Sequence, residues 1–328
     1  MSIEEKLLGA PAGGGGITPS ENFNTVLYTG NGGTNAITGV GFKPDIVYIK
    51  SRSNTESPKI NNSSIGSTYY LYTNQAQTEQ NMATSITSYD SDGFTLGSEG
   101  NSNGSGYTFV AWCWKLNGGT TASNGDGNIT STVQVNDDAG MSVVQYAGTG
   151  SSVQVGHGLS AAPTMVWLKN RTDAVNWYVW TTATGSLIRF EGLNTTSAAV
   201  TSGLSTTVGA STIDFTNTAD FSGSGKDYIM YCFRDIDAYS KFGSYTGNGS
   251  DFGPIVETGF EVGYVMVKRT DTTGSGWAVL DNKRNPTNRR NLVLWLNSDE
   301  VEYTASGGGG IDFLSNGFKV RNANNFDN

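Results

Sequence analysis

The sequence has 328 residues, of which 44 are glycine, 2 are cysteine and 1 is histidine, and only 15% are charged. Its 36% hydrophobic content excludes a disordered chain, and its net charge of −9 excludes nucleic acid as a partner. No run of about 18 apolar residues is present, so we expect no membrane insertion. Abundant glycine, serine, threonine and asparagine predict an all-β fold.

A tail precedes the first predicted domain. Residues 1–23 place Ile3, Leu7 and Leu8 on one side of a short amphipathic helix, which a run of glycines at 13–16 follows. We interpret this segment as a docking peptide on a flexible tether, with a disordered terminus as the alternative. Two acidic residues near its start do not fit a secretory signal, so we expect synthesis in a cytoplasm.

One unit of about a hundred residues occurs three times. A Tyr-x-Gly-x-Gly run begins at Tyr28, Tyr146 and Tyr245, and each run precedes a predicted strand that ends in lysine. The spacing is too long for a solenoid unit and fits tandem β-sandwiches. We therefore predict three jelly-roll-like β-sandwich repeats, copy 1 (24–116), copy 2 (142–235) and copy 3 (242–328), with a linker at 117–141.

The later strands of each copy distinguish copy 3 from the others. A second strand is predicted at 69–72, 177–180 and 277–280, and a last strand, apolar on both faces, at 109–115 and 228–234. Copy 3 reaches Asn328 without that last strand, so its sandwich is expected to have an open edge. We interpret this as a native chain that continues past Asn328, and donation of the strand by a partner or by the N-terminal segment is the alternative.

Several single residues are assigned structural roles. Cys113 and Cys232 hold equivalent positions in different copies, so we predict two free, buried thiols in separate cores. His157 aligns with Val40 of copy 1 and is therefore interpreted as structural.

Basic residues recur at two kinds of position. The lysines that end the first strands are Lys50, Lys169 and Lys268, and we expect their stems to cover the core rim while the ammonium groups stay in water. A cluster at 283–284 and 289–290 is interpreted as a solvated turn, with contact to an acidic neighbouring subunit as the alternative.

Three stretches, at 239–249, 265–270 and 312–321, resemble a family of repeat-containing structural proteins of marine bacteriophages and cyanophages. Residues 39–50 and 155–171 carry the same pattern in the other copies. The resemblance implies a virion protein of the tail-fibre type. It transfers no catalytic residue, because the family has no established ones.

The resulting functional expectation is a phage virion protein, made in the cytoplasm of the infected bacterium, that forms a fibre, appendage or surface decoration and takes part in host attachment. We expect no enzymatic activity and no cofactor. The expected partners are further copies of the chain, with a trimer favoured, other virion proteins and a host-surface glycan. A glycan-binding adhesin outside a virion is the alternative, and a capsule depolymerase is a third hypothesis.

Candidate binding residues are aromatic, because sugar rings stack on aromatic side chains. On the alternate face of the predicted second strands these are Tyr70, Tyr72, Tyr178 and Trp180. No catalytic, cofactor-binding or metal-binding residue is predicted. The Asn-Gly-Asp-Gly-Asn run at 124–128 alternates oxygen ligands as a calcium loop does, but it lacks the later glutamate and is interpreted as linker.

Overall fold

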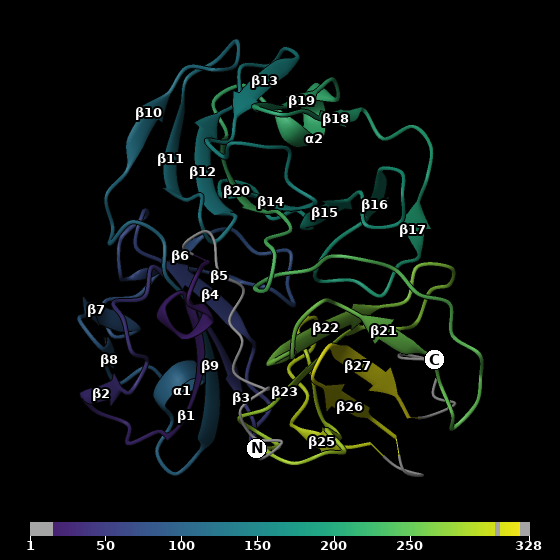
Figure 1. The fold of residues 1–328 in the computed structure, drawn as a ribbon. Helices are drawn as coiled ribbons and strands as arrows, with labels where there is room; N and C mark the ends of the chain where they lie inside the picture. Colours follow the sequence, from purple (N-terminus) through teal and green to yellow (C-terminus); the bar gives the residue numbers. More distant parts are fainter. Residues whose placement is uncertain (1–15, 306–308, 322–328) are drawn as a thin grey trace.

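The computed structural model describes residues 16–305 and 309–321, and it confirms an all-β fold built from antiparallel sheets that pack in pairs (Figure 1). Within the described part of the chain, no helix is long and apolar enough to cross a membrane. The predicted tail lies outside the described residues up to position 15, and a 3-10 turn at Pro19–Glu21 leads into the first strand.

Copy 1 is a sandwich of a six-stranded and a three-stranded sheet. The larger sheet has the order β1 (Phe23–Thr29), β9 (Thr108–Trp114), β3 (Ile46–Ser51), β4 (Lys59–Asn62), β5 (Tyr69–Tyr72) and β6 (Gln80–Asn81). The smaller has the order β2 (Asn35–Thr38), β8 (Gly93–Leu96) and β7 (Ile86–Asp90), and the short helix α1 (Gly100–Asn103) precedes β9. Strand β9 lies between β1 and β3 and is buried over most of its length.

Copy 2 repeats this arrangement with an extension at one edge. Its larger sheet has the order β10 (Ala122–Asn124), β11 (Ser131–Asn136), β12 (Met141–Ala147), β20 (Asp227–Phe233), β14 (Met165–Asn170), β15 (Tyr178–Thr181), β16 (Ile188–Phe190) and β17 (Ala199–Val200). The smaller has the order β13 (Val153–Gly156), β19 (Thr212–Phe215) and β18 (Thr206–Val208), and the helix α2 (Thr218–Phe221) precedes β20. Residues 117–141 therefore contribute two strands to this sheet.

Copy 3 has a four-stranded sheet, β22 (Tyr264–Lys268), β23 (Trp277–Asp281), β24 (Leu292–Trp295) and β25 (Tyr303–Thr304). It packs on β21 (Ile255–Glu257), β27 (Gly317–Val320) and β26 (Ile311–Leu314). Among the described residues, β22 pairs only with β23, so its other edge has no strand beside it.

The second strand of copy 1 differs from the sequence prediction. Strand β4, at Lys59–Asn62, pairs with β3 in the position that β15 and β23 occupy in the other copies, and Tyr69–Tyr72 forms the third strand instead. This polar stretch is fully buried because its side chains find partners within the protein. For example, the Nδ2 atom of Asn62 donates to the Tyr231 hydroxyl at 3.0 Å.

Three sandwich cores surround a fourth, shared core. Cys113 lies in the core of copy 1 and Cys232 in that of copy 2, and both thiols are free and buried, as predicted. The outer faces of the three larger sheets pack against one another in what we call the central core, which contains Tyr48, Trp112, Trp167, Trp177, Tyr231, Trp277 and Leu294. Figure 1 shows the result as three lobes around a common centre, with copy 2 uppermost, so the copies form a closed cluster and not a linear string.

The lobes are joined in a cycle by equivalent backbone hydrogen bonds. The residue two positions after each recurring lysine accepts one bond from the outer strand region of the next lobe. These bonds run from Glu302 N to Arg52 O (2.9 Å), from Glu79 N to Arg171 O (3.0 Å) and from Ala199 N to Thr270 O (2.8 Å). Copy 3 thus bonds to copy 1, copy 1 to copy 2 and copy 2 to copy 3, which closes a ring.

Candidate functional site

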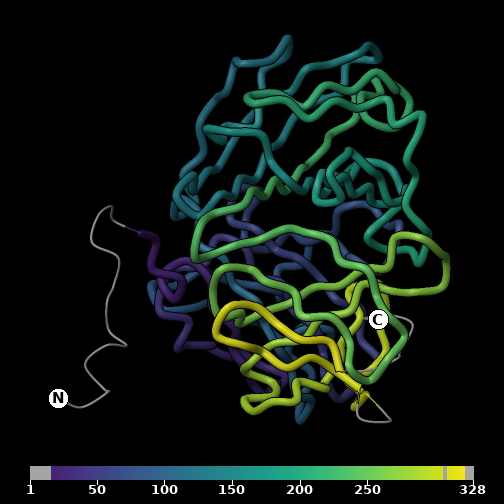
Figure 2. The backbone as a smooth tube through the Cα atoms, turned by 45° about the vertical axis from the view of Figure 1, so that its right-hand side comes forward, coloured from purple at the N-terminus to yellow at the C-terminus, as the bar shows by residue number. Residues whose placement is uncertain are grey.

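A cleft of about 1350 Å³ lies where the three lobes meet, and we call it the central cleft. Figure 2 shows the segment that leads from β20 into copy 3, in green, running between the copy 2 and copy 3 lobes. Its apolar lining comes from every copy: Phe23, Trp114, Met165, Phe233, Phe242, Tyr264 and Met266. All except the buried Met165 pack against the edge of the central core, so the cleft is an opening into that core.

One wall of the central cleft is the open edge of β22. The Asn282 amide donates to Gly263 O at 3.0 Å, and this bond sets the alternation along the strand. The backbone groups of Val265 and Val267 therefore face β23, while those of Tyr264, Met266 and Lys268 face the cleft. No strand among residues 16–305 and 309–321 pairs with these backbone donors and acceptors, which lie beside apolar side chains.

Aromatic rings surround the base of this wall. The Tyr264 ring lies edge-on to Phe23 at 5.6 Å and to Trp112 at 5.8 Å between centroids, and burial raises the pKa of the Tyr264 hydroxyl well above its usual value. Phe233 packs against Phe242 at 6.1 Å on the opposite side. The side chains from three copies thus form an apolar floor.

The lysine that ends β22 and its equivalents in the other copies differ in part from the sequence prediction. Lys268 Nζ donates to Arg269 O at 2.8 Å and lies 5.2 Å from the centre of the Phe190 ring. Its equivalents are fully buried: Lys50 Nζ donates to Glu56 O at 3.1 Å and Lys169 Nζ to Val175 O at 2.7 Å. The expectation that the ammonium groups stay in water is wrong for Lys50 and Lys169, which are buried and bind carbonyls of the loops that follow their strands, whereas Lys268 is half-buried.

Burial has a common electrostatic effect on these three lysines. Removing the ammonium from water disfavours its charged form and lowers the pKa of each to about 8. Nearby carboxylates such as Asp173 beside Lys169 oppose this shift only in part.

The predicted stacking aromatics lie away from the central cleft. Tyr70 and Trp180 are buried, at 1% and 0% exposure, so neither ring has a face open to a ligand. Tyr72 and Tyr178 are partly buried, and their role in glycan binding stays a prediction.

The contacts of these rings explain their burial. Trp180 packs in the copy 2 core against Phe215 and Phe221, and Tyr178 meets Phe221 edge-on at 4.9 Å. The Tyr70 and Tyr72 hydroxyls lie 3.2 Å apart. Tyr178 and Trp180 therefore pack inside the copy 2 sandwich, toward its smaller sheet.

A buried ion pair lies beneath Tyr70. Lys59 Nζ bonds to the Glu99 carboxylate and to Ser85 Oγ (2.8 Å), and it lies 4.6 Å from the centre of the Tyr70 ring. Ser102 Oγ donates to the same carboxylate at 2.9 Å. Because the ammonium group and the carboxylate each bond to a hydroxyl as well as to each other, we interpret this group as part of the buried interior of copy 1.

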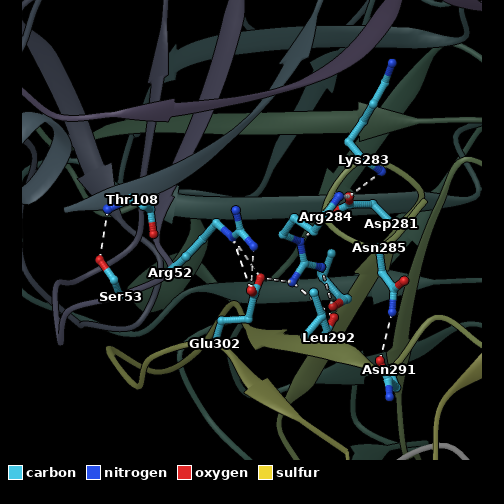
Figure 3. A network of polar contacts seen from close by, with 11 residues as sticks. Arg52, Ser53, Thr108, Asp281, Lys283, Arg284, Asn285, Asn291, Leu292 and Glu302 are labelled. Carbon is cyan, nitrogen blue, oxygen red and sulfur yellow. Dashed lines mark hydrogen bonds and ion pairs between the residues drawn. The ribbon is translucent and has the colours of Figure 1, made fainter. Parts of the chain in front are cut away.

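The basic cluster of copy 3 is only partly the solvated turn that we predicted: Lys283 and Arg289 are exposed, whereas Arg284 and Arg290 are buried. Figure 3 shows Arg284 between Asp281 and Glu302, and Glu302 between Arg284 and Arg52 of copy 1. Arg284 Nε bonds to Asp281 at 2.6 Å and Nη1 to Glu302 at 3.0 Å, while Trp112 Nε1 donates to Asp281 at 3.2 Å. This network joins copies 1 and 3.

His157 is buried, and both of its ring nitrogens bond to the backbone. Its Nδ1 accepts from the Leu159 amide at 3.2 Å, so Nε2 carries the proton and donates to Gly209 O at 3.3 Å. Burial lowers the pKa of the imidazole below its usual value. Within the ranges that the structure describes, no cluster of three or more His, Cys, Asp or Glu side chains is placed to hold a metal ion.

Sequence reasoning missed the residues of the central cleft. Phe23 and Trp114 look like ordinary strand residues of copy 1, and nothing local indicates that they face copy 3. The one available signal was the absence of a last strand from copy 3, which predicts an open edge but not its neighbours.

The sheets and the cleft define the class of protein: an antiparallel β-sandwich protein whose apolar cleft opens between three packed lobes. The chain belongs to the DUF7483 family, described as a domain of unknown function, whose profile matches residues 18–328. No curated protein and no solved structure matches the chain.

Proposed function

We propose that this chain is a structural protein of a bacteriophage particle, where it forms part of an appendage or surface decoration and acts by binding rather than by catalysis. The observation that carries the proposal is the packing of three sandwich lobes on one core, closed by hydrogen bonds between every pair of lobes. Such a body holds its surface loops in fixed relative positions. The resemblance of residues 239–249 to phage structural proteins is our reason for proposing that the chain belongs to a phage particle.

Presentation of the same surface loops by several copies of the chain would favour attachment to a host surface. Several copies of the chain, a trimer in our proposal, would present the same loops together, and linked weak sites gain avidity through effective concentration. Tyr72 and Tyr178 are the candidate contacts with glycan, since these two residues are only partly buried.

The decisive experiment is mass spectrometry of purified phage particles, followed by cryo-electron microscopy to locate the chain. We expect the protein at a fixed stoichiometry in the particle. A protein that is absent from particles but binds a glycan array would favour the adhesin hypothesis instead.

Catalysis is tested separately. Incubation of the protein with host capsular polysaccharide should release no reducing ends. Release that continues with time would overturn the proposal of a binding protein and favour a depolymerase.

A further inference from the structure

We propose that copy 1 contains an internal covalent cross-link, an amide bond that the side chains of Lys59 and Glu99 form with each other inside the folded sandwich. The bond joins β4, in the larger sheet, to the segment that connects β8 of the smaller sheet with α1. The proposal rests on the contacts of these two side chains and does not depend on the phage assignment.

The two reacting groups are in contact and out of water. Lys59 Nζ bonds to Oε2 of Glu99, and the two side chains are 0% and 6% exposed. Glu99 N donates to Thr84 O at 3.1 Å, and Gly97 N donates to Ser85 O at 2.9 Å. These backbone bonds fix the segment that carries Glu99. The fold therefore keeps the amine beside the carboxyl group, which replaces an encounter between two molecules by a step within one.

Copy 2 shows that the sandwich does not need an ion pair at this place. Tyr178 stands in β15 where Lys59 stands in β4, because each is opposite the residue that precedes the recurring lysine. Asn217 precedes α2 as Glu99 precedes α1. In copy 2 the Tyr178 ring meets Phe221 edge-on, with centroids 4.9 Å apart, so an apolar contact occupies the corresponding position.

Glu99 also lacks the ordinary function of its position. A polar side chain at a helix N-cap usually accepts a hydrogen bond from a backbone amide of the first turn. Asn217 accepts two such bonds, from Ala219 N and Asp220 N, whereas Glu99 accepts none and bonds to Lys59 instead. A buried ion pair is often no more stable than apolar packing of similar volume. Capping and packing therefore do not explain the pair, and a reaction between its members does.

The surroundings favour formation of the amide over its hydrolysis. Burial lowers the pKa of the Lys59 ammonium group well below its usual value, so the neutral amine, which is the nucleophile, is accessible. Tyr70 is 1% exposed, and the centre of its ring lies 4.6 Å from Lys59 Nζ. The ring keeps bulk water, the reactant that cleaves an amide, away from the bond.

The reaction releases one water molecule and needs no other reagent. Lys59 Nζ attacks the carboxyl carbon of Glu99, a C–N bond forms, and the bond from that carbon to Oε2 breaks. Two protons pass from Nζ to Oε2, which leaves as water, so nothing is oxidised or reduced. Ser102 Oγ donates to Oε2 at 2.9 Å and assists its departure, while Ser85 Oγ accepts from Nζ at 2.8 Å and orients the amine.

Mass spectrometry of the denatured 328-residue chain tests for the bond. We expect the mass to lie below that of the sequence by one water molecule, about 18 Da. Trypsin cleaves after lysine and arginine, and between Arg52 and Lys115 the sequence offers it only Lys59. An acylated lysine is not cleaved. We therefore expect one peptide, 53–115, in which fragmentation shows Lys59 joined to Glu99, in place of the peptides 53–59 and 60–115.

Lys59→Arg distinguishes a covalent bond from an ion pair. Arginine keeps a positive charge beside Glu99, but its guanidinium stays protonated and does not attack the carboxyl group. We expect this variant to have its full sequence mass and a thermal midpoint lower by about 5 °C or more, because the cross-link between residues 40 positions apart restricts the unfolded chain.

The exposed Lys43 provides the matched control. Lys43→Arg should retain both the missing water and the midpoint of the parent. If Lys59→Arg does not fold, the mass and the tryptic peptides of the parent chain still decide the question.

Two results would overturn the proposal. A parent chain of full sequence mass that trypsin cleaves after Lys59 would show that the pair is an ion pair only. A missing water in a chain that is still cleaved after Lys59 would assign the loss to cyclisation elsewhere, for example at Asp92 and Gly93.

Discussion

Replacement of Glu302 by alanine tests whether buried charges hold the ring of lobes together. The Glu302 side chain is 10% exposed, and its carboxylate accepts hydrogen bonds from Arg52 of copy 1 and from Arg284. The Arg284 side chain is fully buried. Loss of the carboxylate therefore leaves Arg52 without its ion-pair partner and Arg284 with Asp281 alone at the junction of copies 1 and 3.

The expected loss is about 2–3 kcal/mol of unfolding free energy. Removing one partner of a buried ion pair costs about 3–5 kcal/mol, while an exposed pair contributes about 0–1 kcal/mol. Two features lower the cost here: Arg52 is 21% exposed and can turn toward water, and Arg284 keeps Asp281 at 2.6 Å.

Urea unfolding followed by tryptophan fluorescence measures this loss, since Trp112 donates to Asp281 within the network. Asp271→Ala is the matched control, because its pair with Arg269 also spans 2.6 Å but the Asp271 side chain is 69% exposed. We expect the control to leave the unfolding midpoint unchanged. A Glu302→Ala protein as stable as the control would refute the reasoning that this network stabilises the ring.

Three further predictions concern titratable groups. The recurring lysines have a pKa of about 8 when folded and 10.5 ordinarily, so the unfolded chain binds more protons in this window and stability should rise from pH 8 toward pH 10, by up to about 3 kcal/mol for each of the buried Lys50 and Lys169 and by less for the half-buried Lys268, whose charge water screens. Lys169→Met should reduce that slope in urea titrations, and an unchanged slope would contradict the assignment. His157 has a lowered pKa, so stability should fall as the pH drops below about 6.5, and His157→Gln should lose this acid-sensitive part; equal acid sensitivity in the variant would contradict it. Burial raises the pKa of the Cys113 thiol and raises that of Cys232 to about 12, so neither should react with a thiol reagent until the chain unfolds, and fast labelling of the native protein would contradict their burial.

The fold class and the placement of the cysteines were predictable because their signals are local. Alternating apolar residues and glycine-rich turns predict strands, and the equivalent positions of Cys113 and Cys232 place them in different cores. Strand β4 was missed because its residues are polar, and their burial depends on partners far away in the chain, such as Glu99 for Lys59 and Tyr231 for Asn62.

The central cleft and the buried basic residues were not predictable for the same reason. Lysine and arginine side chains are usually exposed in folded proteins, so the sequence alone predicts an exposed position for them. The burial of Arg284 depends on Asp281 and Glu302, and Asp281 also binds Trp112 of copy 1, a contact between residues that are 169 positions apart. Such contacts are set by the packing of the lobes, which no local pattern encodes.

The closed cycle of lobe contacts also determines how the molecule can come apart. In a linear string a terminal module is held by one interface, but here the removal of any lobe breaks two, including the bond from Glu302 to Arg52 or that from Ala199 to Thr270. The peptide connections between the lobes are then additional restraints and not the sole attachment. After a single proteolytic cut in an exposed connection, the two fragments would stay bound to each other as one non-covalent complex.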